Sequence, residues 1–230
     1  MRFWEIDFLR GFGIILMLIS NFITDLQIFL NYPSNQFWDL FAKFTASIFV
    51  FVSGVSFYVC YSIRGIKKIL IRFVKLMSLG FLITIVTSFL LKEGTIYFGI
   101  LHFLALAWIL AIPLYKVNTI PIAAIFIMLT PLIDSVHAKT LLLLPIGITP
   151  PNFYTLDYFP VFPWFGIFLI GLRFGKIFMR SDLKEIGIFK FICLLGRRSL
   201  QIYLIHQPIF VSLIVLIFGD SRGILSIPKL

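Results

Sequence analysis

Charged residues are scarce in this chain of 230 residues: they make up 13% of it, against 60% for hydrophobic residues. A soluble domain of this size needs a polar surface around its core, and so few polar groups cannot supply one. The apolar residues also do not alternate with polar ones, as they would in a transmembrane barrel. They form runs of about 20 residues, the length of a membrane-spanning helix. The composition therefore predicts an all-α polytopic membrane protein with a single domain over residues 1–230.

Cysteine and histidine are also rare. Cys60 and Cys193 are the only cysteines, and both fall near the expected cytoplasmic side, where thiols stay reduced, so we expect no disulfide. No cluster of cysteines and histidines has the spacing of a metal site, and we expect no metal. The N-terminal stretch lacks the small-residue cleavage site of a signal peptide, so we expect the first helix to remain as an anchor.

The apolar runs predict a bundle of about seven transmembrane helices, roughly at 8–30, 38–62, 73–91, 96–115, 119–133, 159–179 and 199–218. The distribution of basic residues predicts that the N-terminus lies inside and the C-terminus outside. In that orientation only five of the 20 basic residues fall in outer segments: Lys43, Lys92, Lys139, Arg222 and Lys229. The net charge of +10 is then a topology signal, and we expect no nucleic-acid partner.

Three segments between the spans have features of their own. Residues 64–75 and 183–195 are basic or amphipathic, and we expect both to lie on the inner membrane leaflet. For 64–75, binding of ligand phosphates is the alternative. Residues 134–158 form a longer connection on the outer side, in which the apolar run 141–148 is too short to span the membrane.

Small residues in two of the expected spans indicate close contacts between helices. Ser53, Gly54 and Ser56 lie together in the second span, and Gly171 and Gly175 form a GxxxG pattern in the sixth. Such positions let helix backbones approach one another. Packing within the chain is the simpler interpretation, and a homo-oligomer remains an alternative.

The first span carries four polar residues, Asp7, Arg10, Asn21 and Asp25, within an apolar run. At 3.6 residues per turn, positions 11 or 18 residues apart lie on nearly the same face of a helix. The four residues therefore form one stripe, about 27 Å long. Polar groups that face lipid are costly, so the stripe is expected to face a protein interior or a wet cavity. An ion pair between Asp7 and Arg10, three residues apart, is expected whatever the function.

Two histidines lie within expected spans. His102 is near the outer end of the fourth span, and His206 is near the middle of the seventh, beside Gln207 and Pro208. A histidine within a span is a candidate for function, although a hydrogen bond between helices is the structural alternative for His102. Pro208 removes a backbone hydrogen bond and is expected to kink its helix.

Several stretches occur together in the order of one family: WEIDFLRGFGIILML, FVFVSGVSF, GILHFLALA, YFPVFPWFGIFLIGLRFGK and LGRRSLQIYLIHQPI. The chain resembles the prokaryotic proteins with a heparan-alpha-glucosaminide N-acetyltransferase-like catalytic domain, which are similar to the wider transmembrane acyltransferase superfamily. The resemblance covers nearly the whole chain. It implies a multi-pass enzyme of the cell membrane that moves an acyl group, in particular acetyl, from cytosolic acyl-CoA to a sugar or glycoconjugate on the outer side.

The resemblance also bears on the site. The first helix of the superfamily often carries a basic residue, ten intervening positions and then a histidine; here Arg10 matches the basic residue, and Asn21 stands at the histidine position. Lysosomal members also have Asn there, with a catalytic His slightly later, but this chain has no His between Asn21 and His102. Since Asn cannot act as a general base, the base must come from elsewhere.

Acyl transfer needs a general base, a hydrogen-bond donor that stabilises the oxyanion, and residues that hold the thioester near the acceptor. We expect His102 to be the base and His206 to be the second choice, with Asp25 or Asp157 orienting a histidine. Asn21 can donate its amide hydrogens to an oxyanion. The phosphates of CoA are expected to bind three arginines at the inner end: Arg10, Arg197 and Arg198.

The alternatives to an enzyme are a non-catalytic transporter, a ligand-binding relative that has lost acyl transfer, and a structural subunit. Transporters often carry inverted or parallel repeats. No internal repeat is visible in the sequence, which disfavours transport. Membrane lipids are partners in every case.

Overall fold

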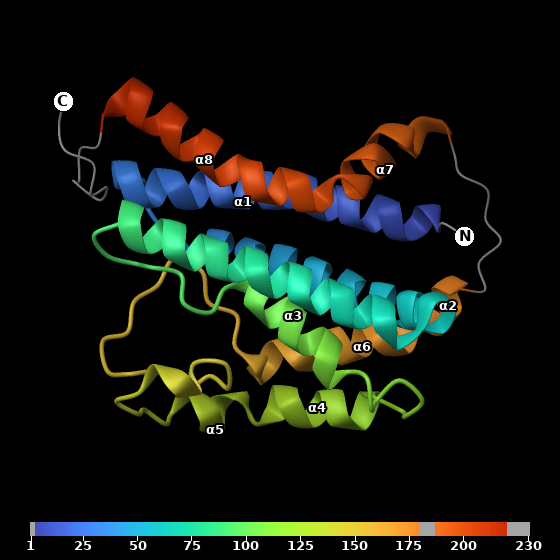
Figure 1. Cartoon of the computed structure of the whole chain (residues 1–230). Coiled ribbons are helices and arrows are strands. Elements are labelled where there is room, and N and C mark those ends of the chain that lie inside the picture. The colour runs from blue at the N-terminus through green and yellow to red at the C-terminus, as the bar shows by residue number, and fades with distance from the viewer. Residues whose placement is uncertain (1–2, 180–186, 220–230) are drawn as a thin grey trace. The chain divides into compact units, whose positions relative to one another are not determined.

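The computed structural model describes residues 3–179 and 187–219, and it is helical throughout these residues apart from loops and isolated bridge residues, among them the pair His137 and Thr149 (Figure 1). This confirms the predicted all-α class. The elements in order are α1 (Trp4–Leu30), α2 (Gln36–Leu90), α3 (Ile100–Leu110), α4 (Ile120–Met128), α5 (Thr130–Asp134), the 3₁₀ helix η1 (Leu141–Leu143), α6 (Val161–Met179), the 3₁₀ helix η2 (Gly187–Phe189), α7 (Lys190–Arg197) and α8 (Ser199–Phe218).

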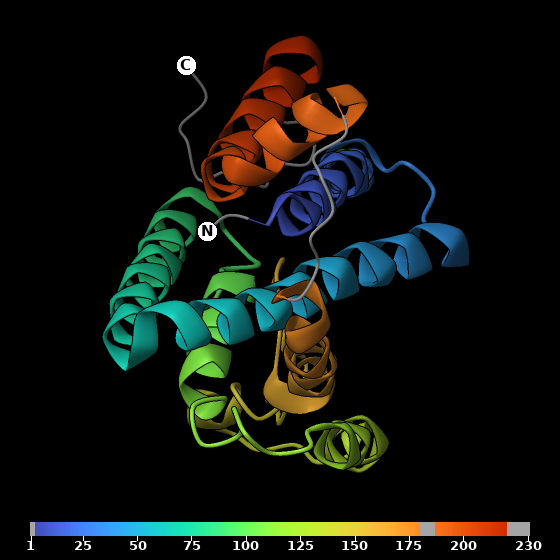
Figure 2. The ribbon, with the colours of Figure 1, turned by 90° about the vertical axis from the view of Figure 1, so that its right-hand side faces the viewer.

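Four of the described helices are long and apolar enough to cross a membrane: α1, α2, α6 and α8. With 55 residues, α2 would be about 80 Å long if it were straight, far more than the ~30 Å of the hydrocarbon core. It turns at Gly65, where φ is 67° and ψ is −171°, a conformation open essentially only to glycine. Figure 2 shows the two legs of α2 leaving this corner in different directions. The turn falls between the predicted spans 38–62 and 73–91, so α2 contains both.

The predicted spans 96–115 and 119–133 differ from the structure. The 11 residues of α3 rise only about 16 Å, and the helix ends at Leu110, shortly before Pro113. The second of these spans is divided into α4 and α5, and Pro131 lies at the start of α5. Proline disfavours helical conformation in the residue before it and cannot donate a backbone hydrogen bond. These two segments are therefore short apolar helices.

The two amphipathic segments have different outcomes. Residues 64–75 form the corner of α2 and the beginning of its second leg, so they are not a separate surface helix. The other segment, 183–195, is described from residue 187 onward and forms η2 and most of α7. Residues 183–186 lie outside the described part of the chain, as do five basic residues used for the orientation: Arg2, Arg180, Lys184, Arg222 and Lys229.

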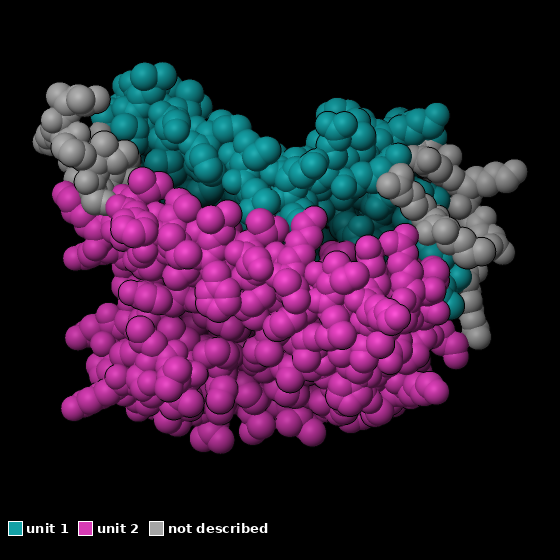
Figure 3. All heavy atoms as spheres, in the orientation of Figure 1, with its two compact units in different colours: residues 1–52, 177–224 teal, residues 53–176, 225–230 magenta. Residues whose placement is uncertain are grey.

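The chain divides into two compact units, coloured separately in Figure 3. Unit 1 comprises residues 1–52 and 177–224, and contains α1, the beginning of α2, α7 and α8. Unit 2 comprises residues 53–176 and 225–230, and contains the rest of α2, α3, α4, α5 and most of α6. Each unit has its own apolar core.

Glycines allow the closest helix contacts in both units. In unit 2, a Cβ at Gly54 would collide with the backbone of α6 at Phe168, and one at Gly175 would collide with Tyr58. In unit 1, a Cβ at Gly11 would collide with the carbonyl of Ile192. The predicted use of small residues for packing within the chain is therefore confirmed at Gly54 and Gly175.

The connection between α5 and α6 is tied to the segment before α3. Asp157 Oδ2 accepts a hydrogen bond from the backbone N–H of Ile100 at 3.0 Å, which caps the first turn of α3. The Tyr158 hydroxyl donates to the carbonyl of Leu144 at 2.8 Å. Burial and the negative charge of Asp134 raise the pKa of Tyr158 to about 12, so this donor keeps its proton at neutral pH. Asp157 thus fixes the helix turn that carries His102.

Candidate functional site

The central polar contact of unit 1 joins α1 and α8, two neighbouring helices that run in the same direction (Figure 1). Asn21 Nδ2 lies 2.7 Å from His206 Nε2, although the two residues are 185 positions apart in the sequence. His206 is 6% exposed, and its ring packs edge-on against Phe210, with a centroid distance of 5.7 Å. The pair therefore lies in a partly buried, apolar environment.

The partners of His206 determine where its proton lies. Its Nδ1 is 2.6 Å from the carbonyl oxygen of Tyr203, one helical turn earlier. A carbonyl oxygen can only accept, so Nδ1 carries the hydrogen and donates it. Nε2 then has the lone pair and accepts a hydrogen bond from the Asn21 amide. The imidazole is thus neutral and held in one tautomer, with its basic nitrogen directed at Asn21.

A second contact lies one turn further along α1, and its partner on α8 is the residue that follows His206. Gln207 Nε2 donates to Asp25 Oδ1 at 2.6 Å. Asp25 is 2% exposed, and its other oxygen, Oδ2, is buried without a hydrogen-bond partner among the described residues. The sequence predicted that Asp25 or Asp157 orients a histidine; in the structure Asp25 holds Gln207, and Asp157 caps α3.

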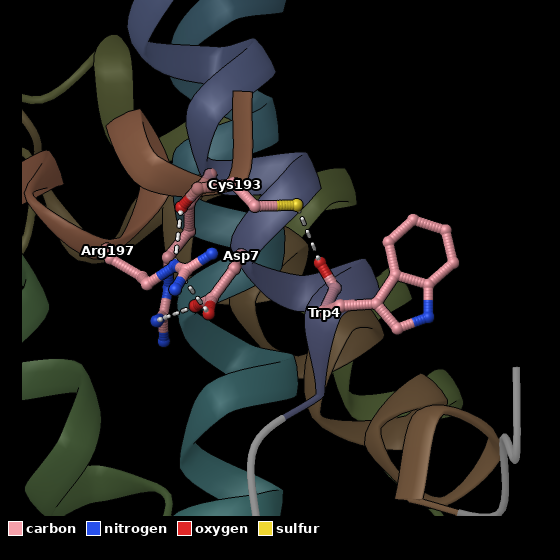
Figure 4. A network of polar contacts seen from close by, with 5 residues as sticks. Trp4, Asp7, Cys193 and Arg197 are labelled. Atoms are coloured by element: carbon pink, nitrogen blue, oxygen red, sulfur yellow. Dashed lines mark hydrogen bonds and ion pairs between the residues drawn. The ribbon is translucent and has the colours of Figure 1, made fainter. Parts of the chain in front are cut away.

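Charged side chains gather where α7 packs against the beginning of α1 (Figure 4). Asp7 lies between two arginines: Arg10 Nη1 is 3.6 Å from Oδ1, and Arg197 Nε is 3.9 Å from Oδ2. The predicted ion pair of Asp7 with Arg10 is confirmed. Arg197 also donates to the carbonyl of Cys193 at 3.3 Å, and Cys193 Sγ contacts the carbonyl of Trp4 at 3.6 Å.

The close approach of α7 to α1 explains this charge cluster. A Cβ at Gly196 would collide with the carbonyl of Asp7, and a Cβ at Gly11 would collide with that of Ile192, so both positions need glycine. Arg197 follows Gly196 directly, which brings its guanidinium to Asp7. Arg198 is exposed at the junction of α7 and α8. Arg10 and Arg197, two of the three predicted phosphate-binding arginines, are thus brought together, and the third, Arg198, follows Arg197 in the chain.

His102 belongs to unit 2 and has different surroundings. It is 3% exposed and packs against Gly80, where a Cβ would come within about 3 Å of the ring. Phe98 stacks on it at 5.7 Å between centroids, and Phe81 meets it edge-on at 5.3 Å. Nε2 is buried and has no hydrogen-bond partner within the described ranges.

Three of the four polar residues in the predicted stripe on α1 face other helices of unit 1. Asp7 faces α7, and Asn21 and Asp25 face α8, so the stripe is turned toward protein partners in unit 1. The sequence did not single out Tyr203, whose carbonyl fixes the tautomer of His206. Helical spacing could have indicated it, because the residue three positions before a histidine lies on the same face of the helix.

The family model described as heparan-alpha-glucosaminide N-acetyltransferase, catalytic, matches residues 2–208 of the 230. The chain belongs to this family. The match spans α1 to the middle of α8 and therefore includes Asn21, His102 and His206. No curated protein and no solved structure matches the chain.

Membership makes this a membrane protein of the acetyltransferase type, and the general donor of the family is acetyl-CoA. The apolar helices agree with a location in a membrane. Within the residues that the structure describes, no group of three or more His, Cys, Asp or Glu side chains is arranged to hold a metal ion.

Proposed function

We propose that the protein is an integral acetyltransferase of the cell membrane. It takes the acetyl group of cytosolic acetyl-CoA and transfers it to an amino or hydroxyl group of a sugar or glycoconjugate on the outer side. The observation that carries this proposal is the contact of Asn21 Nδ2 with His206 Nε2 at 2.7 Å. His206 therefore lies beside Asn21, the residue that stands where the first helix of the superfamily often has a histidine.

His206 is the proposed general base. As the acceptor's nitrogen or oxygen attacks the thioester carbonyl, its proton moves to Nε2, while the hydrogen bond from Nδ1 to Tyr203 stabilises the imidazolium. The carbon–sulfur bond then breaks, and the imidazolium returns the proton to the departing thiolate. The products are the acetylated acceptor and free CoA, and His206 ends in its initial state.

Asn21 is the proposed hydrogen-bond donor for the reaction. Its amide holds the lone pair of Nε2 in place before the acceptor enters. When the acceptor takes that position, the amide hydrogens are available for the oxyanion that forms at the thioester carbonyl. A fixed donor in a site of low dielectric stabilises such an oxyanion strongly. Asn21 therefore replaces the usual histidine in position but not in role.

The phosphates of the donor are proposed to bind Arg10, Arg197 and Arg198. Arg10 and Arg197 share the single carboxylate of Asp7, so the cluster has an excess of positive charge. Guanidinium groups offer several N–H donors in a fixed fork, which suits phosphate oxygens. Arg10 and Asn21 are 11 residues apart on α1, about 17 Å along the helix. An extended pantetheine arm covers a distance of this order, so these residues fit acetyl-CoA.

His102 is proposed as a second functional histidine. Its buried Nε2 lacks a partner among the described residues. A buried polar atom without a hydrogen bond lowers the stability of the fold, so its presence points to a function. The capping of α3 by Asp157 and the packing on Gly80 hold the ring in place. His102 as the general base for transfer is therefore the alternative to His206.

The proposed topology keeps the N-terminus inside, the C-terminus outside and the whole chain as one catalytic domain. The arginine cluster on α1 and α7 is then at the cytosolic end, where acetyl-CoA is present. Asn21 and His206 lie further along α1 and α8, toward the outer side. A homo-oligomer is compatible with this arrangement but is not required by it.

The test uses the full-length protein reconstituted in liposomes. Acetyl-CoA with a radiolabelled acetyl group is supplied on one side and glucosamine on the other, and labelled acetylglucosamine is measured. We expect transfer with wild-type protein and a rise in Tm with CoA, as linkage requires of a ligand. Binding of CoA without transfer to any sugar would support a relative that has lost activity. Movement of unmodified sugar across the membrane would support a transporter.

A further inference from the structure

The carboxyl group of Asp25 has one satisfied oxygen and one unsatisfied oxygen. Oδ1 accepts the hydrogen bond from Gln207 at 2.6 Å, whereas Oδ2 is buried without a partner in residues 3–179 and 187–219. The whole residue is only 2% exposed. An unsatisfied carboxyl oxygen in a buried position costs stability. Such an atom indicates a partner that occupies the site for part of the time.

The position of this oxygen relates it to the proposed reaction centre. Asp25 is four residues after Asn21, so the two side chains lie on the same face of α1, about 6 Å apart along the helix. Their partners, His206 and Gln207, are adjacent in α8. The Asn21–His206 pair and the Asp25–Gln207 pair are therefore consecutive contacts of one helix interface within unit 1.

The chemical nature of Oδ2 indicates which kind of ligand group can bind it. In the ionised form of the carboxyl group, Oδ2 only accepts hydrogen bonds, so a partner of that form donates one through a hydroxyl or an amino group. Gln207 already holds the other oxygen, which fixes the carboxylate in place and directs Oδ2. An anionic ligand such as a phosphate would be repelled. A sugar, with several neighbouring donors, fits these requirements.

We propose that Asp25 is an acceptor-binding residue, and that its Oδ2 receives a hydrogen bond from a hydroxyl or amino group of a sugar acceptor. Another group of the same sugar then meets Nε2 of His206, which removes its proton. Gln207 is a positioning residue, because it acts through Asp25. This inference rests on the proposed acetyltransferase function and assigns the acceptor side of that site.

Binding of the acceptor alone tests the inference without acyl transfer. Purified full-length protein in detergent is titrated with glucosamine, and in a parallel arm with glucose, which has the hydroxyl groups but no amine. Affinity is measured by a change in thermal stability or by thermophoresis. We expect Asp25→Asn and Asp25→Leu to weaken sugar binding at least tenfold. Asp39→Asn, an exposed carboxylate on α2, is the matched control and keeps wild-type affinity.

The comparison of glucosamine with glucose shows whether Oδ2 binds a hydroxyl group or an amino group. Equal losses for glucosamine and glucose in Asp25→Asn mean that Oδ2 binds a hydroxyl group. A loss for glucosamine alone means that it binds the amine. Folding is monitored by the Tm without sugar, which Asp25→Asn should largely keep because its amide oxygen can still accept the hydrogen bond from Gln207. In steady-state assays the same variants should raise the acceptor KM at least tenfold and leave the acetyl-CoA KM unchanged.

Different results would overturn the role of Asp25 and the proposed transferase activity. Active variants at Asp25 with an unchanged acceptor KM and unchanged sugar affinity would overturn the assignment of Asp25 while acetyl transfer stands. A wild-type protein that binds neither sugar would also overturn it. Sugar binding that depends on Asp25 in a protein without transferase activity would support the assignment and refute the enzyme.

Discussion

The two buried histidines of this protein differ in how their ring nitrogens are satisfied. His206, on α8 in unit 1, has Nδ1 bonded to the Tyr203 carbonyl and Nε2 bonded to Asn21. His102, on α3 in unit 2, is packed by two phenylalanine rings and a glycine, and its Nε2 has no partner in the described chain. Both are nearly inaccessible to solvent.

This difference separates stability from function at the two positions. The hydrogen bonds of His206 both hold the protein together and orient a base, so its loss should lower stability and activity together. The buried Nε2 of His102 contributes nothing to stability, so its replacement by an apolar side chain should not destabilise the fold. If His102 is functional, activity and stability will move in opposite directions, as is common at functional sites.

The largest effect is expected at His206. We expect His206→Gln to reduce kcat by about 10²- to 10⁴-fold, the usual contribution of a general base. Stability should fall by about 1 kcal/mol through the lost bond to Tyr203. Acetyl transfer and thermal unfolding measure the two quantities. His137→Gln changes the exposed third histidine and serves as the matched control. Normal transfer by His206→Gln would remove His206 from the mechanism.

The partner of His206 should produce the next largest effect. We expect Asn21→Leu to reduce kcat by about 10²- to 10³-fold, because it removes the proposed oxyanion donor. It also leaves Nε2 of His206 without a partner, which should cost about 1–3 kcal/mol of folding stability. Transfer rate and Tm are measured in the same preparation. A stable, fully active variant would show that the contact is incidental.

The opposite behaviour is expected at His102. We expect His102→Leu to lower transfer at least tenfold while Tm stays the same or rises, because leucine brings no unsatisfied polar atom into the aromatic surroundings. The pair of measurements, kcat and Tm, gives the sign of each change. Loss of both together would mean that His102 is structural and that it hydrogen bonds in the native membrane.

The smallest effects are expected at the arginine cluster, because its members are partly exposed. We expect Arg197→Gln to raise the KM for acetyl-CoA about three- to fivefold with kcat unchanged, since an exposed charge contributes at most about 1 kcal/mol. Arg64→Gln, an exposed arginine on α2, is the control. The difference between the two variants should shrink at high salt. A change in kcat alone would contradict a role in donor binding.

The sequence allowed prediction of the features that depend on local rules. The helical class and the polar stripe on α1 follow from the cost of exposing polar groups to lipid and from helical spacing. The Asp7–Arg10 ion pair follows from the same spacing. These features depend only on residues that are near one another in the chain, so they could be predicted from the sequence.

Features that depend on distant residues could not be predicted in this way. The contact between Asn21 and His206 requires α1 and α8 to pack side by side, and no rule of spacing connects residues 185 positions apart. The predicted number of seven spans is not confirmed. Hydropathy alone could not show that 96–115 and 119–133 form shorter helices, because it gives little weight to Pro113 and Pro131. Hydropathy likewise could not show that one continuous α2 would contain two predicted spans around Gly65.

The central claim is that Asn21 and His206 act as one catalytic unit, and a double-mutant cycle on the transfer rate tests it most directly. The rates of Asn21→Leu, His206→Leu and the double variant are compared with the wild-type rate under saturating acetyl-CoA. If the residues act together, the double variant will be no slower than the worse single variant. Losses that multiply would show that the two side chains act independently and would contradict the claim.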